Sequence, residues 1–167
     1  MTGAPAETPA TAIRSFEASI RPLMPLLLAY FTRRVDPSVD AADCLSETLV
    51  VLWRRRSELP DDDDGLRAWS YGVAKGVLAN HQRSRIRHSR LSARLREDLT
   101  TSPPAQPVDT GLTDALATLS GPDKDLVLLV AWDGFGVAEA GALLGLTPGA
   151  ARSRYSRARK ALRAQLD

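Results

Sequence analysis

The chain has 167 residues, of which 44% are hydrophobic but only 5% aromatic, and it carries 22 Lys and Arg against 20 Asp and Glu. One cysteine and two histidines exclude an internal disulfide framework and a Cys/His zinc cluster. The longest apolar run, residues 23–30, contains Pro25 and is too short to cross a membrane, and no basic start of a secretory signal precedes an apolar stretch. We therefore expect a cytoplasmic protein without a membrane span.

The nearly balanced charge hides three segregated blocks. Residues 36–64 hold nine acids and three bases, whereas residues 81–96 hold six arginines and residues 152–163 hold five arginines and a lysine, both without an acid. Segregated charge says more about binding partners than net charge does.

The N-terminal part of the chain reads as a tail followed by a helix. Residues 1–10 are rich in Ala, Pro and Thr and are expected to form a loose tail. Apolar residues then recur at three- and four-residue spacing through residues 11–35, which predicts a helix. Pro22 and Pro25 are expected to split or kink it.

The second predicted helix spans residues 40–57. It begins at Asp40, a residue type that caps helices, and Cys44 within it is expected to be a small buried residue. Leucines at three- and four-residue spacing form its predicted apolar face: Leu45, Leu49 and Leu52.

Two acids of this helix, Asp43 and Glu47, lie four residues apart and away from the apolar face. Acids at this spacing could form a metal site or an acid–base pair. No histidine lies near them in sequence and no third carboxylate is evident, so an acidic face that is solvated or docks on a basic protein is preferred.

The third predicted helix follows an acidic loop. Residues 60–65 contain four consecutive aspartates and are expected to be solvated, and the helix then spans residues 66–87. Trp69 is expected in the core, whereas Tyr71 is expected to be exposed and able to stack on bases. The arginines that follow exceed what the dipole favours at a helix C-terminus, which predicts phosphate contact.

Residues 100–110 have the composition of a linker, with three prolines among Thr, Ser and Gln. No run of alternating β-branched residues occurs in the sequence. The predicted architecture is therefore all-α, with an N-terminal domain of about ninety residues and a C-terminal domain of about fifty-five.

Residues 137–152 carry the most specific motif, a helix-turn-helix. Gly145 suits the left-handed position that ends a helix. Thr147 is a suitable N-cap and Pro148 suits the first helical position. Gly141 leaves room for the two helices to cross closely.

The second helix of this motif has one apolar and one cationic side. At about 100° per residue, a narrow apolar seam runs along residues 151–162, and five arginines and a lysine lie outside it. A solvated face normally mixes acids and bases, whereas no acid lies between Glu139 and the last residue. Duplex DNA, bound in the major groove, is the predicted ligand.

Taken in order, these segments resemble regions 2 and 4 of extracytoplasmic-function (ECF) sigma factors, the small promoter-recognition subunits of bacterial RNA polymerase. The resemblance to region 2 is carried by residues 33–35, 42–49, 52–55, 66–69, 73–75 and 78–83. The resemblance to region 4 is carried by residues 126–134 and 139–162, including Arg152-Ser153-Arg154-Tyr155.

The resemblance implies an all-α fold with two helical domains joined by a flexible linker. It places the tail at 1–10, the region 2 helical bundle at 11–95, the linker at 96–110 and the region 4 helix-turn-helix at 111–167. It implies a factor that binds core RNA polymerase and promoter DNA and performs no catalysis, with no cofactor or metal. An anti-sigma factor is a further implied partner.

The resemblance also implies roles for matching positions. Core polymerase would dock on Asp43, Glu47 and Arg54. The −10 element would be opened and read by Tyr71, Lys75, Asn80, Arg83 and Arg87. The −35 element would be bound in its groove by Thr147, Gly149, Arg152, Ser153 and Arg154, and at its phosphates by Arg157 and Arg159.

Several small residues depart from the family pattern. Gly76 stands where Asn is frequent, Ala140 and Gly141 replace Ile-Ala, and Ala151 is smaller than the usual Val, which predicts a weakly packed region 4. Two rival interpretations stay open: a stand-alone helix-turn-helix transcriptional regulator, and an enzyme that uses the two acids of the second helix.

Overall fold

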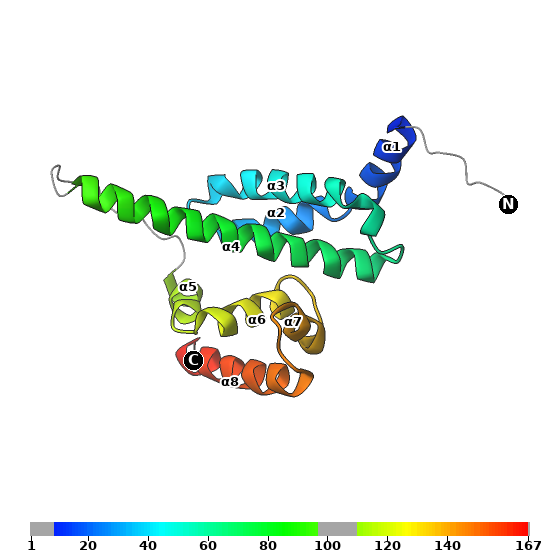
Figure 1. The fold of residues 1–167 in the computed structure, drawn as a ribbon. Helices are drawn as coiled ribbons and strands as arrows, with labels where there is room; N and C mark the ends of the chain where they lie inside the picture. Colours follow the sequence, from blue (N-terminus) through cyan, green and yellow to red (C-terminus); the bar gives the residue numbers. More distant parts are fainter. Residues whose placement is uncertain (1–8, 97–109, 167) are drawn as a thin grey trace. The chain divides into compact units, whose positions relative to one another are not determined.

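The computed structural model describes residues 9–96 and 110–166, and every regular element in these ranges is helical (Figure 1). The chain divides into two compact units, Met1–Leu91 and Ser92–Asp167. The all-α prediction is thereby confirmed for the described residues. The predicted tail and linker fall almost wholly on residues 1–8 and 97–109, which lie outside the described residues.

The first unit contains four α-helices and two 3-10 turns: α1 (Pro9–Ile20), α2 (Met24–Thr32), η1 (Ser38–Asp40), α3 (Ala41–Arg54), η2 (Arg56–Glu58) and α4 (Asp63–Arg96). Helix α2 packs on α3. It also contacts α4, because the Tyr30 and Tyr71 rings meet edge to face with centroids 5.3 Å apart. The core of this unit thus lies between α2, α3 and α4.

The break between α1 and α2 follows the prediction from the two prolines. Helix α1 ends at Ile20, before Pro22, and α2 begins at Met24 with Pro25 in its first turn. Proline is tolerated there because the first amides of a helix have no partner within the helix.

The buried face of α3 differs from the predicted leucine stripe. Cys44, Thr48 and Leu52 are at most 2% exposed, whereas Leu45 and Leu49 are only half-buried. Thr48 can lie in the core because its hydroxyl donates a 2.8 Å hydrogen bond to the Cys44 carbonyl within the helix.

Asp40 occupies the N-cap position of α3 as predicted, but the prediction that it caps the helix is wrong for its side chain. Asp40 has helical backbone angles, and its side chain makes no capping hydrogen bond. Its carboxylate instead lies 3.6 Å from Nε2 of His81 on α4. The Asp40 carboxylate thus contacts α4 and does not form a capping hydrogen bond at the start of α3.

Helix α4 is longer than predicted at both ends, and the acidic loop is shorter. A 2.6 Å hydrogen bond from the Gly65 amide to the Asp62 carboxylate stabilises its start. Asp63 and Asp64 then occupy the first turn, where the helix dipole favours negative charge. The expected core position of Trp69 is only half correct: Trp69 is half-buried, and the Arg55 guanidinium lies 4.6 Å from its ring centroid.

The second unit contains α5 (Thr110–Ala117), α6 (Gly121–Ala131), α7 (Val137–Leu143) and α8 (Pro148–Leu166). Helix α8 packs against the other three helices. One apolar cluster in the core of this unit combines four buried residues with three partly buried ones: Leu116, Val127, Leu128 and Ala158, flanked by Leu119, Tyr155 and Leu162. The apolar seam predicted for residues 151–162 is confirmed as the packing face of α8.

The turn of the helix-turn-helix has the predicted geometry. Gly145 adopts a φ of 72°, in the left-handed region. The Thr147 hydroxyl accepts a 3.3 Å hydrogen bond from the Ala150 amide, as expected of an N-cap. Pro148 is the first residue of α8.

Small residues bring α7 and α8 into close contact. Ala140 and Ala151 are fully buried, and a Cβ atom at Gly141 would overlap the Cβ of Ala151. Two helices that meet through glycine and alanine approach more closely than larger side chains permit. The two helices thus meet closely at this contact, and the weak packing inferred from the small side chains stays a prediction.

No helix in the described part of the chain has the length and apolar character needed to cross a membrane.

Candidate nucleic-acid interface

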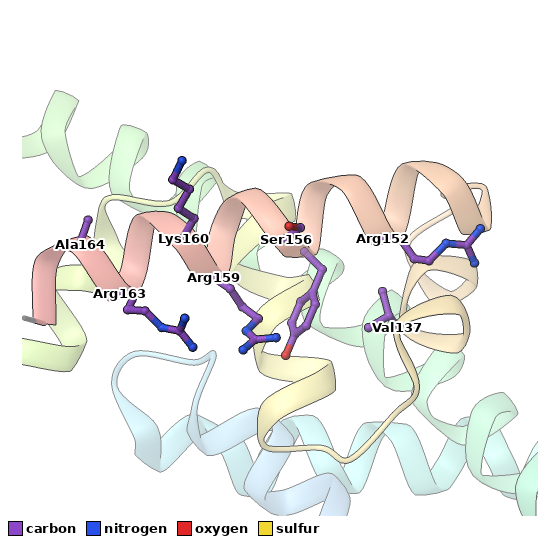
Figure 2. Close-up of a pocket in the computed structure, with 8 residues that line it drawn as sticks. Val137, Arg152, Ser156, Arg159, Lys160, Arg163 and Ala164 are labelled. Carbon is purple, nitrogen blue, oxygen red and sulfur yellow. The ribbon is translucent and has the colours of Figure 1, made fainter.

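A cationic groove of about 550 Å³ runs along α8. Figure 2 shows Arg159 and Arg163 projecting from the same side of α8. Val137 lies near Arg152, toward the opposite end of this helix from Arg163. The groove is lined mainly by residues of α8: Arg152, Tyr155, Ser156, Arg159, Lys160, Arg163 and Ala164. Four side chains that are positive at neutral pH thus border one groove on an exposed helix. This arrangement suits a polyanion.

The predicted −35 residues divide into two groups. Gly149, Arg152, Ser153, Arg157 and Arg159 are exposed along α8. Thr147 is exposed too, but its hydroxyl is engaged in the cap of α8.

Arg154 is different, because it is half-buried and its Nη1 lies 3.8 Å from Oδ1 of Asp123 on α6. At about 100° per residue, Arg152 and Arg154 lie about 160° apart around the helix. They therefore cannot both face the same groove. No acid lies near Arg154 in the sequence, but the fold brings Asp123 of another helix beside it.

Three polar residues that line the groove are absent from the predicted site residues: Ser156, Lys160 and Arg163. Their spacing from Arg152 predicts that they share its side of the helix, because residues four, eight and eleven positions later fall within about 80° of it.

The predicted −10 residues on α4 also fall on different faces. Asn80, Arg83 and Arg87 are exposed and lie within about 60° of one another around the helix. The Arg83 guanidinium donates a hydrogen bond to the Asn80 side-chain oxygen. Lys75 is exposed but lies about 140° from Asn80. The structure thus groups three of the five predicted residues.

The prediction that Tyr71 is exposed and stacks on bases is wrong. Tyr71 is only 1% exposed, and its ring packs edge to face on Tyr30. A base could reach this ring only if the core opened. Tyr71 therefore belongs to the hydrophobic core of the first unit.

Gly76 lies on the same face of α4 as Arg83, about 20° from it. It is exposed, and a Cβ atom added there would meet no atom within 4 Å. Glycine in place of the frequent Asn thus leaves α4 without a side chain at this exposed position and does not affect the core.

The predicted polymerase-binding residues lie on α3. Asp43 and Glu47 are exposed one turn apart, and Arg54 is exposed at the end of the helix. The neighbouring Arg55 is also exposed, but it pairs within the unit, since it donates a 2.6 Å hydrogen bond to Glu58, and this bond lowers the pKa of the Glu58 carboxyl. In the described part of the chain, no group of three or more His, Cys, Asp or Glu side chains could hold a metal ion.

Cys44 lies beside this acidic face but is buried. Burial raises the pKa of its thiol, and the nearby carboxylates of Glu47, Asp40 and Asp43 raise it further. The reactive form of cysteine is the thiolate, so the thiol of the folded protein is expected to be inert at neutral pH.

We expect iodoacetamide to modify Cys44 of the native chain at least about tenfold more slowly at pH 8 than in the chain unfolded in urea. Mass spectrometry over a time course measures both rates. Because the pKa of the native thiol is raised, its reaction should accelerate at a higher pH than that of the unfolded chain. Equal rates in the two states would contradict the buried position.

Comparison with known proteins identifies both units. Residues 20–88 match the family model of sigma-70 region 2, and residues 110–162 match that of sigma-70 region 4. The chain is 36% identical over 138 residues to the ECF RNA polymerase sigma factor SigF of Caulobacter vibrioides, covering 81% of this chain and 76% of the relative. It is 32% identical over 149 residues to the RNA polymerase sigma factor CarQ of Myxococcus xanthus, covering 83% and 82%.

Solved structures agree on the fold. The sigma factor RpoE of Bartonella quintana, solved in complex with the anti-sigma factor NepR, superposes with a TM-score of 0.72 at 23% identity and covers 92% of this chain and 97% of its own. CnrH, solved with the cytosolic domain of CnrY, gives a TM-score of 0.66 at 23% identity and covers 95% and 94%. With both regions matched in order and sequence relatives aligned over most of their length, the chain belongs to the ECF family of RNA polymerase sigma factors, initiation factors of transcription that are generally not enzymes.

Proposed function

We propose that this sigma factor docks on core polymerase through α3, opens and reads the −10 element through α4, and reads the −35 element through α8. The observation that carries this proposal is the distribution of exposed charge. Asp43 and Glu47 stand on α3, whereas the exposed side chains of Arg83 and Arg87 on α4 and the arginines of the α8 groove are cationic. We assign the acidic surface of α3 to the protein partner, and the basic surfaces of α4 and α8 to one DNA element each.

The reading of the −35 element falls to the first turns of α8. Arg152, Ser153 and Arg157 are exposed there, and arginine can contact a guanine edge with two hydrogen bonds in the major groove. Arg159 and Arg163, further along the groove, suit phosphates of the backbone.

The reading of the −10 element falls to the exposed face of α4. Asn80 can hydrogen-bond the edge of an unpaired base, while Arg83 and Arg87 neutralise the phosphates of the separated strand. Lys75 serves a different stretch of backbone, because it stands on another side of the helix. We assign region 2 to residues 11–95 and region 4 to residues 111–167.

The protein performs no covalent chemistry in this proposal and works where core polymerase and the chromosome are, in the cytoplasm. An anti-sigma factor is included among its partners. The structural likeness to RpoE, which was solved in complex with the anti-sigma factor NepR, supports this choice.

Replacing both Asp43 and Glu47 by alanine tests the docking surface. We expect the affinity for core polymerase to fall at least about tenfold, because charges that pair across an interface are lost. Binding is measured by titrating labelled sigma factor with core polymerase. The matched control, Asp61→Ala with Asp64→Ala, removes two exposed acids and should leave binding unchanged.

In vitro transcription with core polymerase tests the function as a whole. The wild-type protein should yield transcripts with defined starts, and mapping those starts identifies its promoters. Unchanged core binding by the Asp43→Ala, Glu47→Ala variant would refute the docking surface. Binding of duplex DNA without promoter-dependent transcripts would favour the stand-alone regulator.

A further inference from the structure

An ion pair joins the DNA-reading helix to its neighbour. Nη1 of Arg154 on α8 lies 3.8 Å from Oδ1 of Asp123 on α6, and the two side chains are 39% and 31% exposed. The contact is therefore partly shielded from water, which strengthens it relative to a fully exposed pair.

The Asp123 carboxylate is held in place by the start of α6. The Ser120 hydroxyl donates a 2.7 Å hydrogen bond to Oδ2 of Asp123, and the Asp123 amide donates a 3.4 Å hydrogen bond back to the Ser120 hydroxyl. The other oxygen, Oδ1, is buried and has no hydrogen-bond partner among the described residues. The negative charge at Oδ1 of Asp123 therefore faces the guanidinium group of Arg154.

The ion pair extends the apolar contact between the two helices. Val127 of α6 and Ala158 of α8 belong to one buried cluster. Asp123 precedes Val127 by four residues, and Arg154 precedes Ala158 by four residues. The ion pair thus lies one helical turn before the apolar contact and holds the N-terminal half of α8 against α6. The proposed base-reading residues lie in this half of α8.

We infer that Arg154 is a positioning residue, which sets the orientation of α8 through Asp123 and does not read a base. This inference rests on the proposed function of α8. It changes the role that the sequence predicted for Arg154, because a side chain about 160° from Arg152 around the helix points away from the face that Arg152 presents to DNA.

The sign of the effect at Asp123 distinguishes this role from a direct contact. Replacing Asp123 by asparagine removes a negative charge from a DNA-binding unit, and electrostatics alone would then strengthen DNA binding. A positioning role predicts the opposite result, because Arg154 loses its anchor.

The experiment uses the complete sigma factor reconstituted with core polymerase, on a promoter found by transcript mapping and on a library randomised in its upstream element. We expect Arg154→Ala and Asp123→Asn each to lower transcription about threefold to tenfold. The base preferred at each position should not change, and the double variant should be no worse than the weaker single variant. Arg154→Lys should recover part of the activity.

Arg152→Ala serves as the comparator, because a base-reading arginine should relax the preference at one or two positions. The inference is overturned if Arg154→Ala relaxes the preference at one position, which would make Arg154 a base reader. It is equally overturned if Asp123→Asn is neutral or raises transcription, which would leave Arg154 as a phosphate contact or without a role. Failure of the wild-type protein to initiate at defined sites would instead refute the proposed function.

Discussion

Gly141→Ala is expected to lower the free energy of unfolding of the second unit by about 1–3 kcal/mol and to impair promoter-directed transcription. The added methyl group would overlap the Cβ of Ala151, both positions are buried, and relief requires α7 and α8 to move apart. Because α8 carries the −35 readers, a shift of this helix also misplaces Arg152 and Ser153. Hydrogen exchange of α7 and α8, measured by mass spectrometry, reports the loss of stability.

Two further variants make this prediction specific. Gly111→Ala adds the same methyl group to a helix of the same unit, where nothing lies within 4 Å, and should be neutral or stabilising by up to about 1 kcal/mol. Adding Ala151→Gly to Gly141→Ala transfers the methyl group across the contact and should recover much of the loss. An unchanged exchange rate in Gly141→Ala would show that α7 and α8 do not meet through this glycine.

Tyr71→Ala is expected to have the larger effect, a loss of about 3–5 kcal/mol from the first unit. The ring is 1% exposed and packs against Tyr30 on α2, so its removal leaves a cavity between α2 and α4. Since both proposed functions of this unit depend on its fold, core binding and promoter opening should fail together. Urea unfolding followed by circular dichroism measures the stability.

Tyr71→Phe is the matched control, because it keeps the ring and removes only the hydroxyl, which should cost about 1 kcal/mol. Core binding should survive in this variant. If Tyr71→Ala stays as stable as the wild type, binds core polymerase normally and fails only in promoter opening, Tyr71 stacks on a base and the buried position is refuted.

Local patterns predicted much of the fold because the interactions that produce it are local. Pro22 and Pro25 separate α1 from α2, and Gly145 and Thr147 form the turn before α8, each through the backbone of a few neighbouring residues. The apolar seam of α8 followed from helical periodicity in the same way. Such features depend little on what the rest of the chain does.

The errors arose where a distant segment competes with a local preference. Asp40 is a suitable N-cap in isolation, yet its carboxylate lies beside His81 of another helix. Tyr71 lies four residues from Arg67 and from Lys75 in the sequence, yet its side of α4 faces α2. The α3 core face, with Thr48 in it, depends on a hydrogen bond inside the helix and on close neighbours that spacing alone does not reveal.

By itself, the sequence determined the helical fold class, the helix-turn-helix and the segregation of acidic and basic surfaces, because periodicity, turn chemistry and charge are properties of short segments. The motifs in order also indicated the ECF sigma family, which the matches to regions 2 and 4 confirm. Only the tertiary structure decided which side of α3 and of α4 is buried. It thereby removed Tyr71 from the candidate base readers, placed Arg154 against Asp123, and showed that Gly141 and Ala151 pack closely, because burial and ion pairing join residues far apart in the chain.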